Sequence, residues 1–142
     1  MKYAWQTSIG IGTIVAIAAG RFILQEGKEG PRQGETASLM LPDLSPEQQT
    51  GRALFDANCT ACHGQNALGS DRGPPLLHRI YEPSHHSDLA FLLAVRKGVR
   101  AHHWKYGNMP AIDGISDNEV VQITAYVRAL QRANGINQGH AP

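Results

Sequence analysis

The sequence predicts an all-α domain, and three observations carry this prediction. Three segments each open with a helix start signal and continue with apolar residues spaced three and four positions apart. No segment holds the strict apolar–polar alternation of a half-buried strand. The segments are separated by two irregular stretches, 64–83 and 101–114. Loops of this length beside so few helices indicate a further organising element, and a bulky cofactor at the centre would supply it.

The first expected helix begins at Ser45, which serves as N-cap, with Pro46 at the first helical position and Gln48 completing a capping box. It runs to about Asn58, with Leu54 and Phe55 on its inner side.

The second and third helices have similar signals. The second starts at Ser87-Asp88 and ends at Gly98. The third starts at Ser116, with Glu119 three residues on, and ends near Ala133. The expected inner stripes are Leu89, Leu92, Leu93 and Val95 in the second helix, and Val120, Ile123, Val127 and Leu130 in the third.

The N-terminal segment predicts export. Residues 3–20 carry no charge and lie between Lys2 and Arg21. Residues 1–24 are therefore interpreted as a signal-anchor helix or as a cleaved signal peptide. The anchor is favoured, because cleavage after Ala18 would leave an apolar run near the mature N-terminus. Either reading places the rest of the chain on the periplasmic side of the membrane, anchored or, after cleavage, soluble.

The remaining organisation follows from composition. Residues 25–44 mix Gly, Pro, Glu, Gln and Ser without an apolar period, so we expect a flexible linker, and 45–142 form the folded domain. Thirteen basic and twelve acidic side chains give a net charge of +1, which excludes a strongly basic nucleic-acid-binding protein. We expect no nucleic acid among the partners.

The chemistry is concentrated in Cys59-Thr60-Ala61-Cys62-His63. C-x-x-C-H is the attachment motif of c-type haem. Two thiols three residues apart can reach the two vinyl groups on one porphyrin edge, and the adjacent His63 can then ligate the iron. A thioredoxin-like dithiol would need a βαβ setting, and a zinc site would need further nearby ligands. The sequence has neither.

With this motif the chain resembles the class I c-type cytochromes over about residues 45–133. Gly51 and Phe55 stand eight and four residues before Cys59. The resemblance implies that the first and last helices cross closely at Gly51 and that Tyr126 packs there. It therefore implies a cytochrome c-like domain whose helices surround one covalent haem.

The resemblance also implies how the iron ligand His63 is held. Gly73-Pro74-Pro75-Leu76 resembles a family motif whose Pro carbonyl accepts the second N–H of the ligand His. Pro74 matches that position, and Pro75 is the alternative because the doubled Pro blurs the register.

Met109, in a Met-Pro pair before the third helix, is the candidate for the second iron ligand. The following Pro biases its backbone to an extended form, and the family's second ligand lies in such a pair. The rival ligands are imidazoles of two pairs, His85-His86 and His102-His103, for which the sequence gives no firm role. Surface capture of copper or zinc is one alternative for these pairs.

Other side chains near these motifs have expected supporting roles. Trp104 and Tyr106 are expected to pack against the porphyrin edge or shield the ligand loop. Arg72 and Arg79 are candidates to neutralise haem propionates, with solvated loop charge as the alternative. A local basic cluster before Met109 could steer an acidic redox partner. It comprises Arg96, Lys97, Arg100 and Lys105.

The sequence thus predicts a single-haem electron carrier that works between membrane or periplasmic redox partners and is not itself an enzyme. One alternative is a fixed cytochrome subunit of a larger membrane oxidoreductase. The other is a haem enzyme or sensor whose sixth iron position is open.

Overall fold

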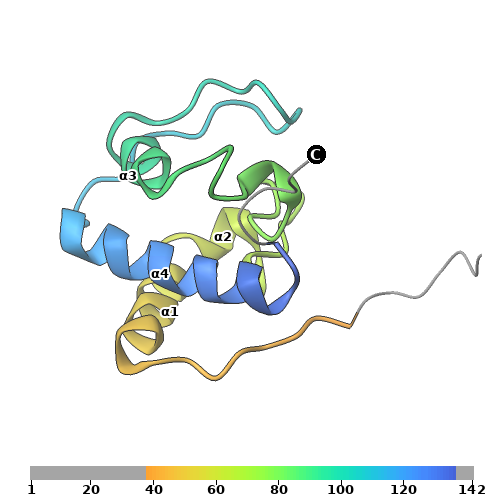
Figure 1. The fold of residues 1–142 in the computed structure, drawn as a ribbon. Coiled ribbons are helices and arrows are strands. Elements are labelled where there is room, and N and C mark those ends of the chain that lie inside the picture. The colour runs from red at the N-terminus through yellow and green to blue at the C-terminus, as the bar shows by residue number, and fades with distance from the viewer. Residues whose placement is uncertain (1–37, 137–142) are drawn as a thin grey trace, which may run out of the picture. The chain divides into compact units, whose positions relative to one another are not determined.

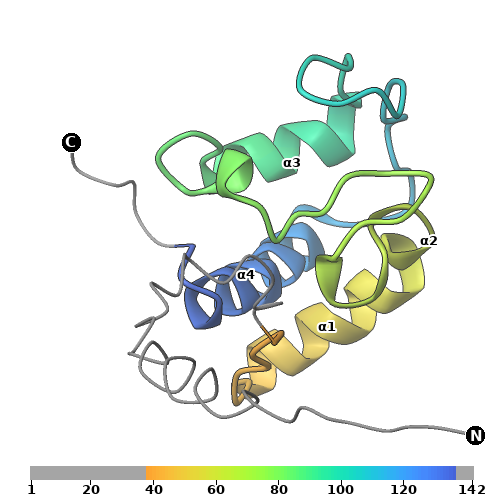
Figure 2. The same ribbon diagram turned by 90° about the vertical axis from the view of Figure 1, so that its right-hand side faces the viewer.

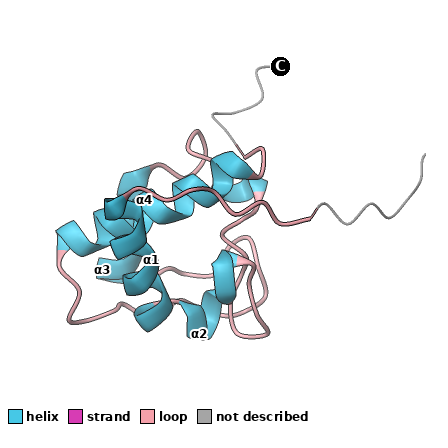
Figure 3. Cartoon of the chain, turned by 90° about the horizontal axis from the view of Figure 1, so that it is seen from below, coloured by secondary structure: helices cyan, strands magenta, loops and turns pink. Residues whose placement is uncertain are grey.

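The computed structural model describes residues 38–136, and within this range the chain is all-helical, as predicted. Isolated pairing between Val99 and Met109 is the only β-type bridge among these residues. The elements are α1 (Pro46–Asn58), α2 (Thr60–His63), η1 (Gln65–Ala67), η2 (Arg79–Tyr81), α3 (Asp88–Lys97) and α4 (Asp117–Ala133), joined by long loops (Figures 1 and 3).

The expected N-terminal helix, 1–24, lies outside the described residues, as does most of the linker 25–44. Between residues 38 and 136 no helix has the length and apolar content needed to cross a membrane. The end of the expected linker lies against α4, because the backbone N–H and carbonyl of Met40 both bond to the Asn134 side chain, each at 2.9 Å. Leu44 also packs against the core.

The first and last helices begin with the predicted capping boxes. In α1 the Ser45 hydroxyl accepts the Gln48 N–H at 3.3 Å, and the Gln48 side chain accepts the Ser45 N–H at 3.0 Å. In α4 Ser116 and Glu119 make the same reciprocal pair, at 3.3 and 2.7 Å. These bonds satisfy backbone donors that the first helical turn leaves free.

Helix α3 has the predicted bounds, but its N-cap residue makes no capping hydrogen bond. Ser87 has the extended backbone of an N-cap, yet its hydroxyl caps nothing, and the Asp88 carboxylate instead accepts a 2.8 Å bond from Arg128. The predicted inner stripe is partly wrong, since Leu89 and Leu93 are 60% and 41% exposed. The helix ends as expected at Gly98, whose φ is +70°.

Helices α1 and α4 cross closely (Figures 1 and 2). The crossing is at Gly51, where an added Cβ would lie 1.9 Å from the carbonyl oxygen of Gln122. Beside it the rings of Phe55 and Tyr126 meet edge to face, with centroids 5.6 Å apart. The predicted helix crossing and aromatic pair are therefore both present.

Helix α4 also fixes a distant loop through two buried polar side chains, Arg128 and Gln131. Arg128 donates to the carbonyl of Tyr81 at 2.7 Å and to that of His86. The Gln131 amide donates to the carbonyls of Leu76 and Tyr81, at 2.9 and 3.1 Å. The irregular segment between η1 and α3 is thus held against α4 by hydrogen bonds that its backbone carbonyls accept.

We expect Gly51→Ala to destabilise the haem-loaded protein by about 2–3 kcal/mol or more, because the added methyl overlaps backbone that cannot move independently. At an unhindered helix position the same change would stabilise, by about 1 kcal/mol. Denaturant unfolding measures the difference. Thr50→Ala, on the exposed side of α1, is the control and should stay within about 0.5 kcal/mol of wild type. A Gly51→Ala protein as stable as wild type would contradict the crossing.

Candidate haem site

The two cysteines and His63 lie on consecutive turns at the end of α1. Cys59 caps α1, with its N–H bonded to the Phe55 carbonyl at 2.8 Å. The N–H groups of Cys62 and His63 both bond to the Cys59 carbonyl, at 3.1 and 2.9 Å. This turn, α2, presents the three side chains within one short segment, and no disulfide joins the two thiols.

The surroundings of Cys59 favour its neutral thiol. Burial and, to a smaller extent, the neighbouring Cys62 raise the pKa of Cys59 to about 11. Redox-active and zinc-binding cysteines need the opposite, a pKa lowered toward or below neutrality. Cys59 thus differs from the low-pKa thiols of redox-active and zinc-binding sites.

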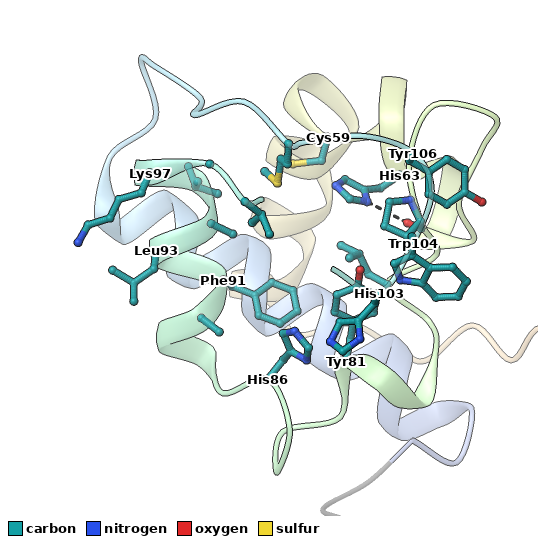
Figure 4. A pocket seen from close by; sticks show the side chains of 18 of the residues that line it. Cys59, His63, Tyr81, His86, Phe91, Leu93, Lys97, His103, Trp104 and Tyr106 are labelled. Atoms are coloured by element: carbon teal, nitrogen blue, oxygen red, sulfur yellow. Dashed lines mark hydrogen bonds between the residues drawn. The ribbon is translucent and has the colours of Figure 1, made fainter. Parts of the chain in front are cut away.

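His63 is held in one orientation by a hydrogen bond. Its Nδ1 donates to the carbonyl of Pro74 at 2.9 Å, since a carbonyl can only accept (Figure 4). Pro74, and not Pro75, therefore holds the expected position. Burial lowers the pKa of His63, while the Pro74 bond acts in the opposite direction. The imidazole is thus neutral at pH 7, with Nε2 left as a lone-pair donor for a metal.

Met109 is fixed by backbone pairing directly after α3. Its N–H and carbonyl bond to the carbonyl and N–H of Val99, at 3.0 and 2.9 Å. The pairing requires a glycine at position 98, because a Cβ there would lie only 2.5 Å from the Met109 carbonyl oxygen. The sequence predicted that Met109 lies in a loop held by Pro110. It did not predict the pairing with Val99, because no local sequence pattern indicates it.

A cavity of about 410 Å³ brings these residues together, within the range of cofactor sites. Cys59, His63, Pro74 and Met109 all line it, whereas Cys62 is half-buried and does not. Its other walls are largely apolar and come from α3, α4 and the loops. They include Leu76, Phe91, Ala94, Val95, Val120 and Ile123.

Trp104 and Tyr106 line the cavity as well, as expected of side chains near the ligand loop (Figure 4). The Trp104 indole N–H is buried and has no hydrogen-bond partner among the described residues. Burial raises the pKa of Tyr81 and the nearby Trp104 opposes that rise, but the two groups are not aligned as a hydrogen bond. An unpaired buried donor facing a cavity fits a group that accepts hydrogen bonds there.

The charged residues expected near the cofactor are arranged differently. Arg72 and Arg79 are exposed and do not belong to the cavity walls. In the basic cluster, Arg96 is paired with Asp117 through its Nε at 2.7 Å, and only Lys97 borders the cavity.

Both histidine pairs come together beside the cavity. The rings of His102 and His103 lie 4.2 Å apart, and His86 lies 5.4 Å from His103. His86, His102 and His103 contribute to the cavity wall. Sequence analysis found both pairs but could not foresee that they meet.

The fold and this site define a helical domain built for a prosthetic group held by two thiols and one imidazole. The family model for cytochrome c matches residues 48–131, more than half of the chain. The chain therefore belongs to the cytochrome c family, whose members bind haem c covalently. The residues fit that group: two free thiols at the required spacing, an oriented His63 and an apolar cavity.

Comparison with known proteins finds similarity to one curated protein and to two solved structures. Lupanine 17-hydroxylase (cytochrome c) of a Pseudomonas species is 37% identical over 86 residues, which are 60% of this chain and 11% of that protein. This chain thus spans about a tenth of that relative. Cytochrome cL of Methylophaga aminisulfidivorans MPT is 22% identical, with a TM-score of 0.48. The match covers 68% of this chain and 69% of the cytochrome cL chain. The c-type cytochrome XoxG of Methylobacterium extorquens AM1 is 25% identical, with a TM-score of 0.49. The match covers 68% of this chain and 56% of the XoxG chain.

We expect Cys59→Ala and Cys62→Ala each to reduce covalent haem, since each removes one of the two thioether bonds. The double variant should carry none. Haem staining of a denaturing gel against total protein measures this. Thr60→Ala, within the same motif, keeps both thiols and should stain like wild type. Full staining of the double variant would contradict attachment at these cysteines.

Proposed function

We propose that this chain is a single-haem electron carrier with His63 and Met109 as the two iron ligands. The observation that carries the proposal is that both side chains line one apolar cavity. The His63 ring is held by its bond to the Pro74 carbonyl, and the Met109 backbone is held by its pairing with Val99. When bound, haem iron supplies a one-electron change between its ferrous and ferric forms. With both axial positions filled, no substrate can bind the iron, so the chain carries electrons and does not catalyse a reaction itself.

The residues around the cavity set the conditions for this exchange. The Pro74 carbonyl fixes the His63 ring, and the Val99 bridge keeps the weak thioether ligand of Met109 in place. The Trp104 indole N–H would donate to a haem propionate, which gives this buried donor its partner. A soft thioether ligand favours ferrous iron and raises the reduction potential.

The partner surface lies where α3 meets the cavity. Leu93 and Lys97 point outward from α3 at this place (Figure 4) and Leu89 is 60% exposed on the same helix. Arg100 and Lys105 are exposed on the following loop. Apolar contact ringed by positive charge suits a redox protein with an acidic docking face.

The second candidate is a fixed cytochrome subunit of a larger oxidoreductase. The relative named Lupanine 17-hydroxylase (cytochrome c) favours it, because that protein's name joins an enzyme activity to a cytochrome c. In this case the same haem domain would take electrons from one permanent partner.

Residues 1–24 support a location at the membrane. Their uncharged stretch, between Lys2 and Arg21, would anchor the haem domain on the periplasmic side, with the predicted linker 25–44 supplying the tether.

The ligand assignment is tested by Met109→His, which should keep the haem six-coordinate and lower its midpoint potential. The expected drop is on the order of 0.1 V, a fraction of the ~0.8 V that axial ligands span. Met40→His, at an exposed Met outside the cavity, should leave the potential unchanged. The wild-type ferric spectrum should contain the charge-transfer band of Met-ligated haem, and its absence would move the assignment to a histidine. Ready binding of CO by the ferrous wild type would contradict a closed iron.

Location and partnership are tested together by isolating the chain from its native membranes without overexpression. We expect the full-length mass and release by detergent but not by high salt. Release as a single species supports the carrier, whereas a co-purifying stoichiometric dehydrogenase or oxidase supports the fixed subunit. A mature chain that begins near Ala19 would contradict the anchor and leave a soluble periplasmic carrier.

A further inference from the structure

Four imidazoles from two separate loops form one cluster beside the haem cavity. We call His85, His86, His102 and His103 the histidine cluster. Ring centroids in it lie 4.2 to 6.3 Å apart. One pair follows η2 and the other follows α3, so the contact joins segments far apart in the chain. Figure 4 shows His86 and His103 side by side.

Three members of the cluster have the spacing of a metal site. One ring nitrogen from each of His85, His86 and His103 lies within 4.8 Å of the other two. Nitrogens bound to a tetrahedral Zn²⁺ at 2.0–2.1 Å stand about 3.3 Å apart. His85 and His103 are exposed, so their side chains can rotate through the remaining distance while the half-buried His86 stays in place.

We propose that His85, His86 and His103 form a three-histidine site for a divalent transition-metal ion, Zn²⁺ or Cu²⁺, at the rim of the haem cavity. Neutral imidazole is the ligand these ions prefer among protein nitrogens, and three of them leave a fourth position for water. The site uses neither His63 nor Met109, the two proposed iron ligands, although His86 and His103 also border the haem cavity.

Backbone contacts prepare His86 for this role. Its Nδ1 donates to the carbonyl of Ile80 at 2.6 Å, which leaves Nε2 as the free lone pair. Metal-binding histidines commonly have this arrangement, in which a carbonyl fixes the ring and its tautomer. His86 is also fixed through its own backbone, because its carbonyl accepts from Arg128.

The surroundings of His86 and His103 favour their neutral forms. Burial lowers the pKa of His86, opposed by the Ile80 bond and assisted by His85, His102 and Arg128. The pKa of His103 is lowered by partial desolvation and by the three neighbouring imidazoles. The Arg128 charge that faces His86 is paired with Asp88 at 2.8 Å. A lowered pKa favours the neutral form of these two rings, which is the form that binds a metal.

A bound ion would join two loops that otherwise touch only through side chains. One loop leads from η2 to α3, and the other leads from α3 to Met109. Binding to the folded state alone would stabilise the haem-loaded protein by mass action.

The test is calorimetric titration of Zn²⁺ into the ferric, haem-loaded full chain at neutral pH, where His63 is bound to iron. We expect one Zn²⁺ per chain and a rise in Tm with added Zn²⁺. His85→Asn and His103→Asn, both at exposed positions, should each weaken the affinity about tenfold or more and abolish the rise. The matched control is His102→Asn, in the same loop, whose ring lies outside the three-nitrogen group. It should bind within about threefold of wild type.

A second measurement identifies the ligand atoms. Electron paramagnetic resonance of Cu²⁺ added to the ferric protein should show coupling to imidazole nitrogens, lost in His103→Asn and kept in His102→Asn. Ferric haem cannot reduce Cu²⁺, so the signal persists. Absence of stoichiometric binding in the wild type, or equal affinity in wild type and His103→Asn, would overturn the site. An equal loss in His102→Asn would overturn this choice of ligands.

Discussion

The close crossing of α1 and α4 at Gly51 is the constraint on which the site depends. With no side chain at Gly51, the two helices approach until its Cα faces the Gln122 carbonyl. That approach places Cys59, at the end of α1, beside the α4 residues that wall the cavity, Val120 and Ile123. An α1 displaced by even one methyl would carry both thiols and His63 with it. The packing of α1 against α4 therefore determines where the haem-attachment residues lie in this fold.

Helix α4 also organises the opposite end of the site through polar contacts. Arg128 and Gln131 are buried, yet each finds backbone carbonyls of the irregular segment before α3 as partners. A buried guanidinium is costly unless it is paired and fully hydrogen-bonded, and here Asp88 supplies the charge. The cation also lies over the Phe91 ring, 4.8 Å from its centroid, so the group that holds the loop also supports a wall of the cavity.

Local signals made the helices predictable, whereas the long-range polar contacts were not. Ser45 and Ser116 begin their helices with bonds to residues three positions away, which a sequence displays directly. Ser87 shows the limit: the start was right, but Asp88 serves Arg128, forty residues on, and the hydroxyl caps nothing.

The same distinction separates the two proposed iron ligands. His63 and its supporting carbonyl at Pro74 could be predicted from the sequence. Both residues lie in motifs through which the chain resembles class I c-type cytochromes. Met109 could be proposed, but the Val99 bridge that fixes its backbone depends on how the chain turns after Gly98. The two histidine pairs were visible in the sequence, and only the fold shows that they face each other.

The exposed Leu89 and Leu93 show why the inner face of α3 was hard to assign. The sequence predicted an inner stripe of Leu89, Leu92, Leu93 and Val95. The cavity is lined by Phe91, Leu93, Ala94 and Val95, so two residues of that stripe reach it and Leu89 does not. A flat cofactor presents a different surface from a helix, so Leu93 can border the cavity and still be 41% exposed, while Leu89 is 60% exposed. The cofactor also explains why so few helices and such long loops suffice for this domain. The apolar faces of α1, α3 and α4 are covered by haem and not by a further helix.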